Sequence, residues 1–277
     1  MNELLLGNEV PIRLGFFMAI FALMAGWEVF APRRTGQLKR RLRWPSNLAI
    51  VALNTLLLRV IMPTTAVGLA LAGEAAGWGL LQQFEWPLWA ASLLAIICLD
   101  LAIYLQHIMF HAVPLLWRLH RMHHADLAFD VTTGARFHPF EIILSMLIKL
   151  TVIAALGPPA VAVLIFEVLL NALAMFNHAN ARLPIGLDKW LRRAIVTPDM
   201  HRVHHSVIPR EANSNFGFNL SIWDRAFGTY CAQPTGGHQE MSIGISAFRT
   251  ERELILDSML VQPFKSSVDT YSINKAH

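Results

Sequence analysis

The sequence predicts an all-α integral membrane protein: a helical bundle of three spanning helices plus a helical hairpin, with a cytoplasmic His-rich cap. Three observations lead to this fold class. Of the 277 residues, 55% are hydrophobic and only 15% are charged, whereas a typical soluble domain is about 25% charged. The apolar residues gather in long runs, as membrane-spanning segments require. The histidines cluster at the end of one run and in the polar segments that follow.

Three apolar runs in the first half of the chain predict the spanning helices. They cover residues 14–30, 48–72 and 86–110, and a spanning helix needs about 20 mainly apolar residues. The second run is interrupted by Arg59 and Pro63, so we expect that helix to be tilted or kinked.

Two shorter apolar segments predict the hairpin. Residues 142–156 and 160–176 are separated by Gly157-Pro158-Pro159, a triplet that breaks a helix. Each segment is at or below the minimum length for a full crossing. We therefore expect a pair of helices that passes through or deeply into the bilayer and returns.

The charge distribution predicts on which side of the membrane the histidines lie. A run of basic residues follows the first span: Arg33, Arg34, Lys39, Arg40, Arg41 and Arg43. Between two apolar spans, such a run indicates a cytoplasmic loop rather than a nucleic-acid site. Counting spans from this loop brings all histidine clusters to the cytoplasmic side. The N-terminus has no basic n-region and no cleavage site, so we expect no removable signal peptide.

Two further stretches have the pattern of segments that lie at a membrane surface. Leu187, Trp190, Leu191 and Ile195 share one helical face, which suits a helix in the plane of the headgroups. Residues 248–261 are a weaker amphipathic candidate.

The histidine spacing predicts a metal site. The pattern H-x-x-x-H is followed by H-x-x-H-H and, far downstream, by a second H-x-x-H-H, in which the histidines are His107, His111, His120, His123, His124, His201, His204 and His205. A shuffled chain with 12 histidines would hold about 0.02 copies of H-x-x-H-H. On a helix, positions 1, 4 and 5 of this motif fall within an arc of about 100°, so each triplet can direct three imidazoles to one point. Imidazole suits iron, zinc, copper or nickel.

Two more histidines complete a set of ten candidate ligands. His178 follows the second hairpin segment, and His138 precedes the first. Because one metal takes four to six ligands, the number predicts two metals. The only cysteines, Cys98 and Cys231, form no C-x-x-C motif and offer no thiolate site.

Several carboxylates near the histidines have two readings. Glu141, Asp199, Asp224, Asp126 and Asp130 are able to orient imidazoles through the second ring nitrogen, and a capping or turn role is as consistent with the sequence. Asp100, inside the third span, either holds a histidine or a polar substrate group, or pairs with Arg59 of the second span.

Besides the histidine motifs, four segments of the sequence match a known family. They are residues 132–141 (TTGARFHPFE), 197–205 (TPDMHRVHH), 215–219 (NFGFN) and 223–230 (WDRAFGTY). With the histidine motifs, they make residues 88–230 resemble the fatty acid hydroxylase / sterol desaturase superfamily of integral-membrane di-iron oxygenases. The similarity is greatest to the bacterial members and the alkylglycerol monooxygenase branch.

The resemblance implies a centre of two Fe ions, with zinc possible in the purified protein. Such a centre uses O2 and two electrons to hydroxylate or desaturate an unactivated C–H bond of a lipid. The expected partners are a lipid substrate, O2, the membrane and a separate electron-transfer protein, and not nucleic acid. The expected location is the inner membrane of a bacterium. The implied domains are N-terminal transmembrane helices (1–87), a fatty acid hydroxylase-like catalytic domain (88–235) and a C-terminal amphipathic segment and tail (236–277).

The resemblance also implies which histidines bind metal. The eight histidines of the three motifs match family ligand positions, and His178 matches an intermediate ligand. Here the sequence departs from the family, because Arg182 occupies the position of a further histidine. One metal then has one ligand fewer, or takes His138.

Two other classes of function stay open from the sequence. One is a zinc-dependent membrane hydrolase or lyase, which usually needs fewer ligands and an open position. The other is a non-catalytic metal-binding or transport protein, whose transport would need ligands spread along a path through the bilayer.

Overall fold

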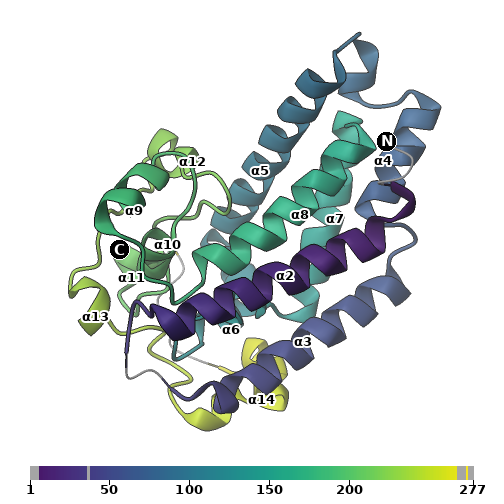
Figure 1. The fold of residues 1–277 in the computed structure, drawn as a ribbon. Helices are drawn as coiled ribbons and strands as arrows, with labels where there is room; N and C mark the ends of the chain where they lie inside the picture. Colours follow the sequence, from purple (N-terminus) through teal and green to yellow (C-terminus); the bar gives the residue numbers. More distant parts are fainter. Residues whose placement is uncertain (1–5, 36–37, 267–272, 274–277) are drawn as a thin grey trace.

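The computed structural model describes residues 6–35, 38–266 and 273, and every regular element within these ranges is a helix. The long helices form a bundle, and short helices and loops gather at one end of it (Figure 1). In this part of the chain the only β-structure consists of isolated bridges. The predicted all-α class is confirmed.

Five segments of the described chain are long and apolar enough to cross a membrane. Four are the helices α2 (Glu9–Phe30), α5 (Leu88–Ala112), α7 (Pro139–Leu156) and α8 (Ala160–Asn177), and the fifth begins with α3 (Arg40–Ile61). α8 packs against α2 and α5, while α7 packs against α3 and α5. Long apolar helices are therefore present at the predicted places in the chain, and α7 and α8 form the predicted hairpin.

The turn of the hairpin depends on glycine. α7 ends at Leu156, and the φ of its C-cap Gly157, 58°, lies in the left-handed region that glycine adopts at low cost. A Cβ on Gly157 would lie 2.2 Å from the carbonyl oxygen of Trp78. The loop before α5 therefore packs closely onto this turn, and Gln82 Nε2 donates a hydrogen bond to Gly157 O at 2.8 Å.

The second apolar run is two helices instead of one. α3 ends at Ile61, and α4 (Ala66–Ala76) starts after a break that contains Pro63. The prediction of one tilted or kinked helix was wrong, because the proline removes a backbone donor and Thr65 then caps a new helix by accepting from Gly68 N at 2.9 Å. α4 packs on α7 and α8 at the end of the bundle away from the short helices (Figure 1).

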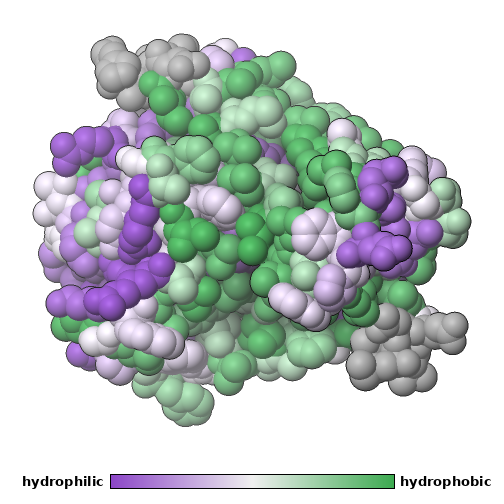
Figure 2. Space-filling model, turned by 90° about the horizontal axis from the view of Figure 1, so that it is seen from above, coloured by the Kyte–Doolittle hydropathy of each residue, from purple (hydrophilic) through white to green (hydrophobic). Residues whose placement is uncertain are grey.

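The outer surface of the bundle is apolar. Phe30, Val60 and Trp89 expose 89%, 75% and 72% of their surface. Figure 2 shows hydrophobic side chains across the middle of one face, with hydrophilic groups towards both ends. A surface of this kind is covered by lipid rather than by water. The chain is an integral membrane protein.

Short elements form the cap at one end of the bundle. They are α6 (Pro114–His124), η2 (Thr133–Ala135), α9 (Ile185–Leu191), α10 (Pro198–His204), α11 (Pro209–Ala212), α12 (Ile222–Ala226), α13 (Gly237–Glu240), η3 (Glu251–Leu254), α14 (Leu256–Val261) and η4 (Gln262–Phe264). On α9, Leu187 and Trp190 point outwards, and their contact with headgroups stays a prediction. Residues 248–261 contain the separate helices η3 and α14, because Ile255 between them is extended.

Candidate metal centre

Five histidines from three helices form the first group. His107 and His111 lie one turn apart near the end of α5, and α6 begins directly after that helix. α6 contributes His120 and His124, and α10 contributes His204. One ring nitrogen of each lies within 4.8 Å of the others. We call this set the five-histidine group.

Four histidines form the second group beside it. His123 comes from α6, His178 from the end of α8, and His201 and His205 from α10 and its C-cap. Their ring nitrogens also lie within 4.8 Å of one another, and we call this set the four-histidine group. All nine side chains are buried. The two groups adjoin, because the rings of His124 and His205 stack with centroids 4.6 Å apart.

The two H-x-x-H-H triplets divide between the groups. His120 and His124 join the five-histidine group while His123 joins the other; on α10, His201 and His205 join the four-histidine group while His204 crosses over. The prediction that each triplet serves one point was wrong. On a helix, positions 1 and 5 lie about 40° apart, whereas position 4 lies about 100° from position 5. Position 4 of each triplet therefore faces the other group.

Six of the nine imidazoles are oriented through their outer nitrogen. In four rings Nδ1 faces a backbone carbonyl oxygen: His107 with Phe216 (2.8 Å), His123 with Arg136 (3.2 Å), His178 with Ala174 (2.8 Å) and His204 with Ser214 (2.7 Å). In the other two it faces a side-chain oxygen: His111 with Asn213 Oδ1 (3.1 Å) and His120 with Glu141 Oε1 (2.6 Å). Because these oxygens can only accept a hydrogen bond, each of the six rings must carry its proton on Nδ1. Nε2 of these rings is therefore unprotonated and directed into its group, as second-sphere partners of metal-binding histidines arrange it.

The inward nitrogens fit metal ions. His107 Nε2 lies 3.1 Å from His120 Nε2, and His178 Nε2 lies 3.1 Å from His201 Nε2. Nε2 of His107 and Nε2 of His120 are both unprotonated, so they cannot bond to each other, and a buried acceptor without a partner is costly. Nε2 of His111 and His204 and both nitrogens of His124 and His205 have no partner among the described residues. A cation shared by each group's lone pairs would satisfy these atoms.

Outside the spanning helices, burial keeps the histidines neutral. Burial first, and then the positive charges of neighbouring histidines, would lower the pKa of five of them well below the usual range: His123, His124, His201, His204 and His205. Burial lowers the pKa of His178 to about 3. Neutral imidazole is the form that binds a metal.

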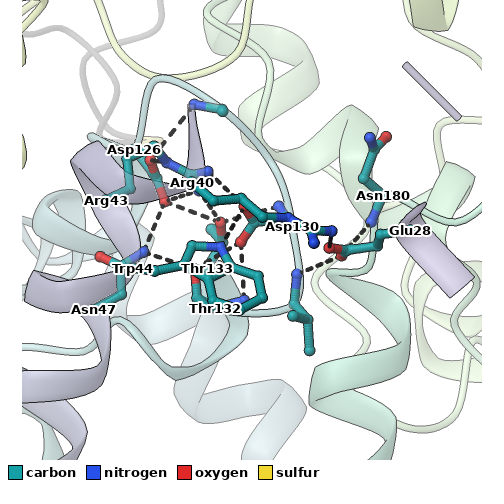
Figure 3. A network of polar contacts seen from close by, with 12 residues as sticks. Glu28, Arg40, Arg43, Trp44, Asn47, Asp126, Asp130, Thr132, Thr133 and Asn180 are labelled. Atoms are coloured by element: carbon teal, nitrogen blue, oxygen red, sulfur yellow. Dashed lines mark hydrogen bonds and ion pairs between the residues drawn. The ribbon is translucent and has the colours of Figure 1, made fainter. Parts of the chain in front are cut away.

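A buried ion network holds the loop that follows α6 (Figure 3). Arg43 donates to both oxygens of Asp126 at 2.6 Å, to Asp130 at 2.6 Å and to Thr133 Oγ1 at 3.0 Å. Burial alone would raise the pKa of Asp126, but the charge of Arg43 and its hydrogen bonds lower it to about 2. Asp126 and Asp130 thus fix the backbone next to the first triplet and do not orient an imidazole.

Glu28 extends this network to the second half of the chain. Its Oε1 accepts from Val131 N at 2.7 Å and from Asn180 N at 2.8 Å, and its Oε2 accepts from Arg40 at 2.9 Å (Figure 3). The end of α2 thereby joins the loop after α6 to the segment that follows His178. No sequence pattern predicted this role for Glu28.

Of the other carboxylates, only Glu141 orients a candidate ligand directly. Asp199 binds Arg33 and Arg202. Asp224 accepts from the backbone N–H groups of Phe216 and Gly217, at 2.7 and 2.9 Å, so it shapes the loop whose carbonyl holds His107.

Asp100 contacts neither a histidine nor Arg59, and its interaction with a polar substrate group stays a prediction. It accepts from Trp223 Nε1 at 2.8 Å and from Leu220 N at 3.2 Å, rather than holding a histidine or pairing with Arg59. It anchors the loop before α12 to α5.

His138 lies outside both groups. Its Nδ1 accepts from Phe140 N at 3.3 Å, so it is the N-cap of α7, and its Nε2 faces Leu260 O at 3.2 Å. Arg182 pairs through its backbone N–H with Ala31 O at 2.9 Å. The group that contains His178 thus has four histidines, one fewer than its neighbour, and His138 does not replace the missing one.

Two aromatic rings and a glycine complete the walls of the four-histidine group. The histidine spacing did not predict these residues. The ring of Phe137 stacks on His123 with centroids 4.5 Å apart, and Phe129 stacks on His178 at 5.6 Å. A Cβ on Gly134 would lie 2.7 Å from Ala174 O and 3.0 Å from His178 Nδ1. The smallest residue is needed there for His178 to keep its backbone partner.

A cavity of about 300 Å³ reaches this centre from within the bundle. Gly134, Phe137, Glu141 and Ala174 line its inner end, and each of them touches or holds one of the histidines. Residues of α2, α3, α5, α7 and α8 line the rest, and the surface is mainly apolar. A cavity of this size and lining suits an apolar ligand next to the residues that hold the histidines.

These features define an integral membrane protein with a buried, all-histidine centre next to an apolar cavity. The sequence model of the fatty acid hydroxylases matches residues 92–229, a segment that contains all nine grouped histidines. The chain belongs to the fatty acid hydroxylase family.

Three relatives have the following similarities. The ornithine lipid hydroxylase OlsE of Rhizobium tropici is 28% identical over 159 residues, covering 57% of this chain and 47% of the relative. The alkylglycerol monooxygenase of Xenopus tropicalis is 30% identical over 146 residues, which cover 52% of this chain and 30% of the relative. The fatty acid hydroxylase vlmA of a Lecanicillium species is 31% identical over 168 residues, which cover 55% of this chain and 45% of the relative. The chain thus spans between about a third and a half of the length of these relatives. No solved structure matches it.

Proposed function

We propose that this protein oxidises an unactivated C–H bond of a membrane lipid, with two iron ions, O2 and electrons from a separate protein. One observation carries the proposal: nine buried imidazoles direct ring nitrogens into two adjoining groups beside an apolar cavity of the bundle, and five of these rings have nitrogens without a partner among the described residues. The family supports lipid hydroxylation, as do the relatives named lipid hydroxylase and monooxygenase.

The two groups would hold one ion each. His107, His111, His120, His124 and His204 would bind one, and His123, His178, His201 and His205 the other. Iron in these positions supplies redox chemistry with O2, which zinc, a d10 ion, does not. We assign His138 to capping and not to ligation.

The protein's own residues orient the centre and exclude water. The carbonyl and carboxylate acceptors fix six rings, and Glu141 adds a negative charge beside a centre that has only neutral ligands. Phe137 and Phe129 close two sides of the four-histidine group. The cavity then positions a lipid carbon, and the metal supplies the difficult chemistry.

The topology suits this function. If the basic loop before α3 faces the cytoplasm, so does the cap with its histidines. A soluble electron donor then approaches from the cytoplasm while the lipid arrives from the bilayer. We place the protein in the inner membrane of a bacterium.

Metal analysis combined with lipid analysis tests the proposal. We expect about two iron ions per chain after anaerobic purification, since there are two groups. Lipid extracts from expressing cells should contain a species that has gained one oxygen or lost two hydrogens by mass spectrometry. Desaturation and hydroxylation differ in this readout.

His124→Ala and His205→Ala should abolish the product while the protein still inserts into the membrane. His238→Asn, a buried histidine outside both groups, is the control and should retain activity. Zinc in active protein, with turnover unaffected by the removal of O2, would overturn the proposal in favour of a hydrolase.

A further inference from the structure

We infer that the membrane cavity measures the acyl chain from its methyl end, with an ion cluster of Arg13, Lys149 and Glu167 as its closed end. The inference rests on the proposed function and specifies its regiochemistry. The position of the oxidised carbon would then be set by its distance from the chain terminus, and not by its distance from the lipid headgroup.

The cavity has one end at the histidines and the other at charged residues. Along α7, one helical face lines it from Glu141 past Ser145 to Lys149, and along α8 another lines it from Ala174 back to Glu167. Glu141 and Ala174 hold His120 and His178. The two helices therefore form walls that lead away from the centre and end at the same cluster.

The cavity is open to lipid on one side. α2 packs along α8 and α3 along α7. α2 and α3 contact each other at the end near the cap, where Arg40 donates to Glu28 at 2.9 Å and the ring of Phe21 lies 5.5 Å from that of Trp44. Phe17 of α2 and Val51, Thr55 and Leu58 of α3 line the cavity from this side. A chain is thus able to enter sideways from the bilayer between α2 and α3.

The cluster is made of paired charges inside the spanning segments. Glu167 is only 1% exposed. Its carboxylate accepts from Lys149 and forms an ion pair with Arg13 at 2.9 Å. Arg13 also pairs with Glu9 at 2.9 Å. Ionisable groups at this depth are costly and usually have a function.

These charges form a barrier for a hydrocarbon chain. To extend further, the chain end would have to separate Glu167 from its partners. Breaking a buried ion pair costs several times what one more buried methylene gains. A methyl terminus therefore stops at the cluster, and additional methylenes remain on the headgroup side of the oxidised carbon.

The distance to the cluster sets the position that is oxidised. Lys149 is eight residues beyond Glu141, which corresponds to about 12 Å of helix at about 1.5 Å per residue. An extended covalent chain advances about 1.1–1.2 Å per bond. We therefore expect about ten bonds between the oxidised carbon and the methyl end.

The test uses cells that express the protein and are fed saturated fatty acids of increasing chain length. The position of the new hydroxyl group or double bond in the cellular lipids is read by mass spectrometry. We expect the count from the methyl end to stay constant as the chain lengthens. A count that is constant from the carboxyl end, or oxidation of a headgroup or sterol ring, would overturn the inference and leave the proposed function standing.

The variant Lys149→Ala distinguishes two roles of the cluster: a barrier that stops the acyl chain, and a contact that only holds the helices together. It deepens the closed end while Glu167 keeps Arg13 as a partner. The oxidised carbon should move farther from the methyl end, by up to about four bonds, the atoms that lysine has beyond Cβ. A purely structural role predicts less product at an unchanged position, which would refute the inference.

Thr151→Ala is the control, because Thr151 is exposed on the same helix. It should change neither the amount nor the position of the product. A wild-type protein that forms no oxidised lipid would contradict the proposed function itself.

Discussion

The ion network before the metal centre provides the sharpest test of how the cap is held. In Arg43→Met, the volume of the side chain is roughly kept while its charge and donors are removed. Arg43 is 1% exposed and bonds to two carboxylates that are themselves buried, Asp126 and Asp130. The substitution leaves both carboxylates without their main counter-ion.

The expected loss follows from that burial. Removing one partner of a buried ion pair costs about 3–5 kcal/mol, because the other charge stays buried and unpaired. Thr133 Oγ1 still donates to Asp126 at 2.9 Å, and Trp44 Nε1 to Asp130 at 3.1 Å, so we expect a value within this range despite two pairs being lost. For a chain of this size, the melting temperature should fall by roughly 10 °C.

Thermal unfolding in detergent, followed by tryptophan fluorescence, measures the loss in the same buffer for all variants. Arg41→Met is the matched control, since Arg41 is an exposed neighbour on α3, and it should change the free energy of unfolding by less than about 0.5 kcal/mol. Adding Asp126→Asn and Asp130→Asn to Arg43→Met should recover part of the loss. An Arg43→Met protein as stable as Arg41→Met would refute the reasoning.

Three further substitutions probe the metal centre. Glu141→Gln keeps an acceptor for His120 but removes the charge, so the affinity for metal should fall about 10- to 100-fold in competition with a chelator; an unchanged affinity would contradict the orienting role. Gly134→Ala forces a methyl group against the backbone partner of His178, and should lower the metal content by about one ion per chain, with full occupancy as the contrary result. His138→Ala should retain both ions and cost about 1 kcal/mol of stability through the lost N-cap, whereas the loss of an ion would make His138 a ligand.

The spanning helices were predictable because hydropathy is a local property of the sequence. The runs 86–110, 142–156 and 160–176 correspond closely to α5, α7 and α8. The break between α3 and α4 was underestimated, because Pro63 allows either a kink or a new start. Thr65, which caps the new helix, decides between them.

The candidate ligands were predictable because histidine is rare and its spacing on a helix limits where rings point. Their orienting partners were not. Four of the six acceptors are backbone carbonyls, such as those of Phe216 and Ser214, and every residue has a carbonyl. The ion network was equally hidden, since Arg43 and Asp126 are 83 residues apart and only the tertiary fold makes them neighbours.

The division of the two triplets links metal binding to folding. If each triplet served one ion, α6 and α10 would each bind metal alone and docking of the two helices would add little. Instead, each group takes residues from both helices, with His123 and His204 as the histidines that cross over. The five-histidine group is complete only when α5, α6 and α10 are packed together, and the four-histidine group only when α6, α10 and the end of α8 are. Ions that bind only this packed arrangement stabilise it by their whole binding free energy, which offsets the cost of burying nine imidazoles beside the membrane.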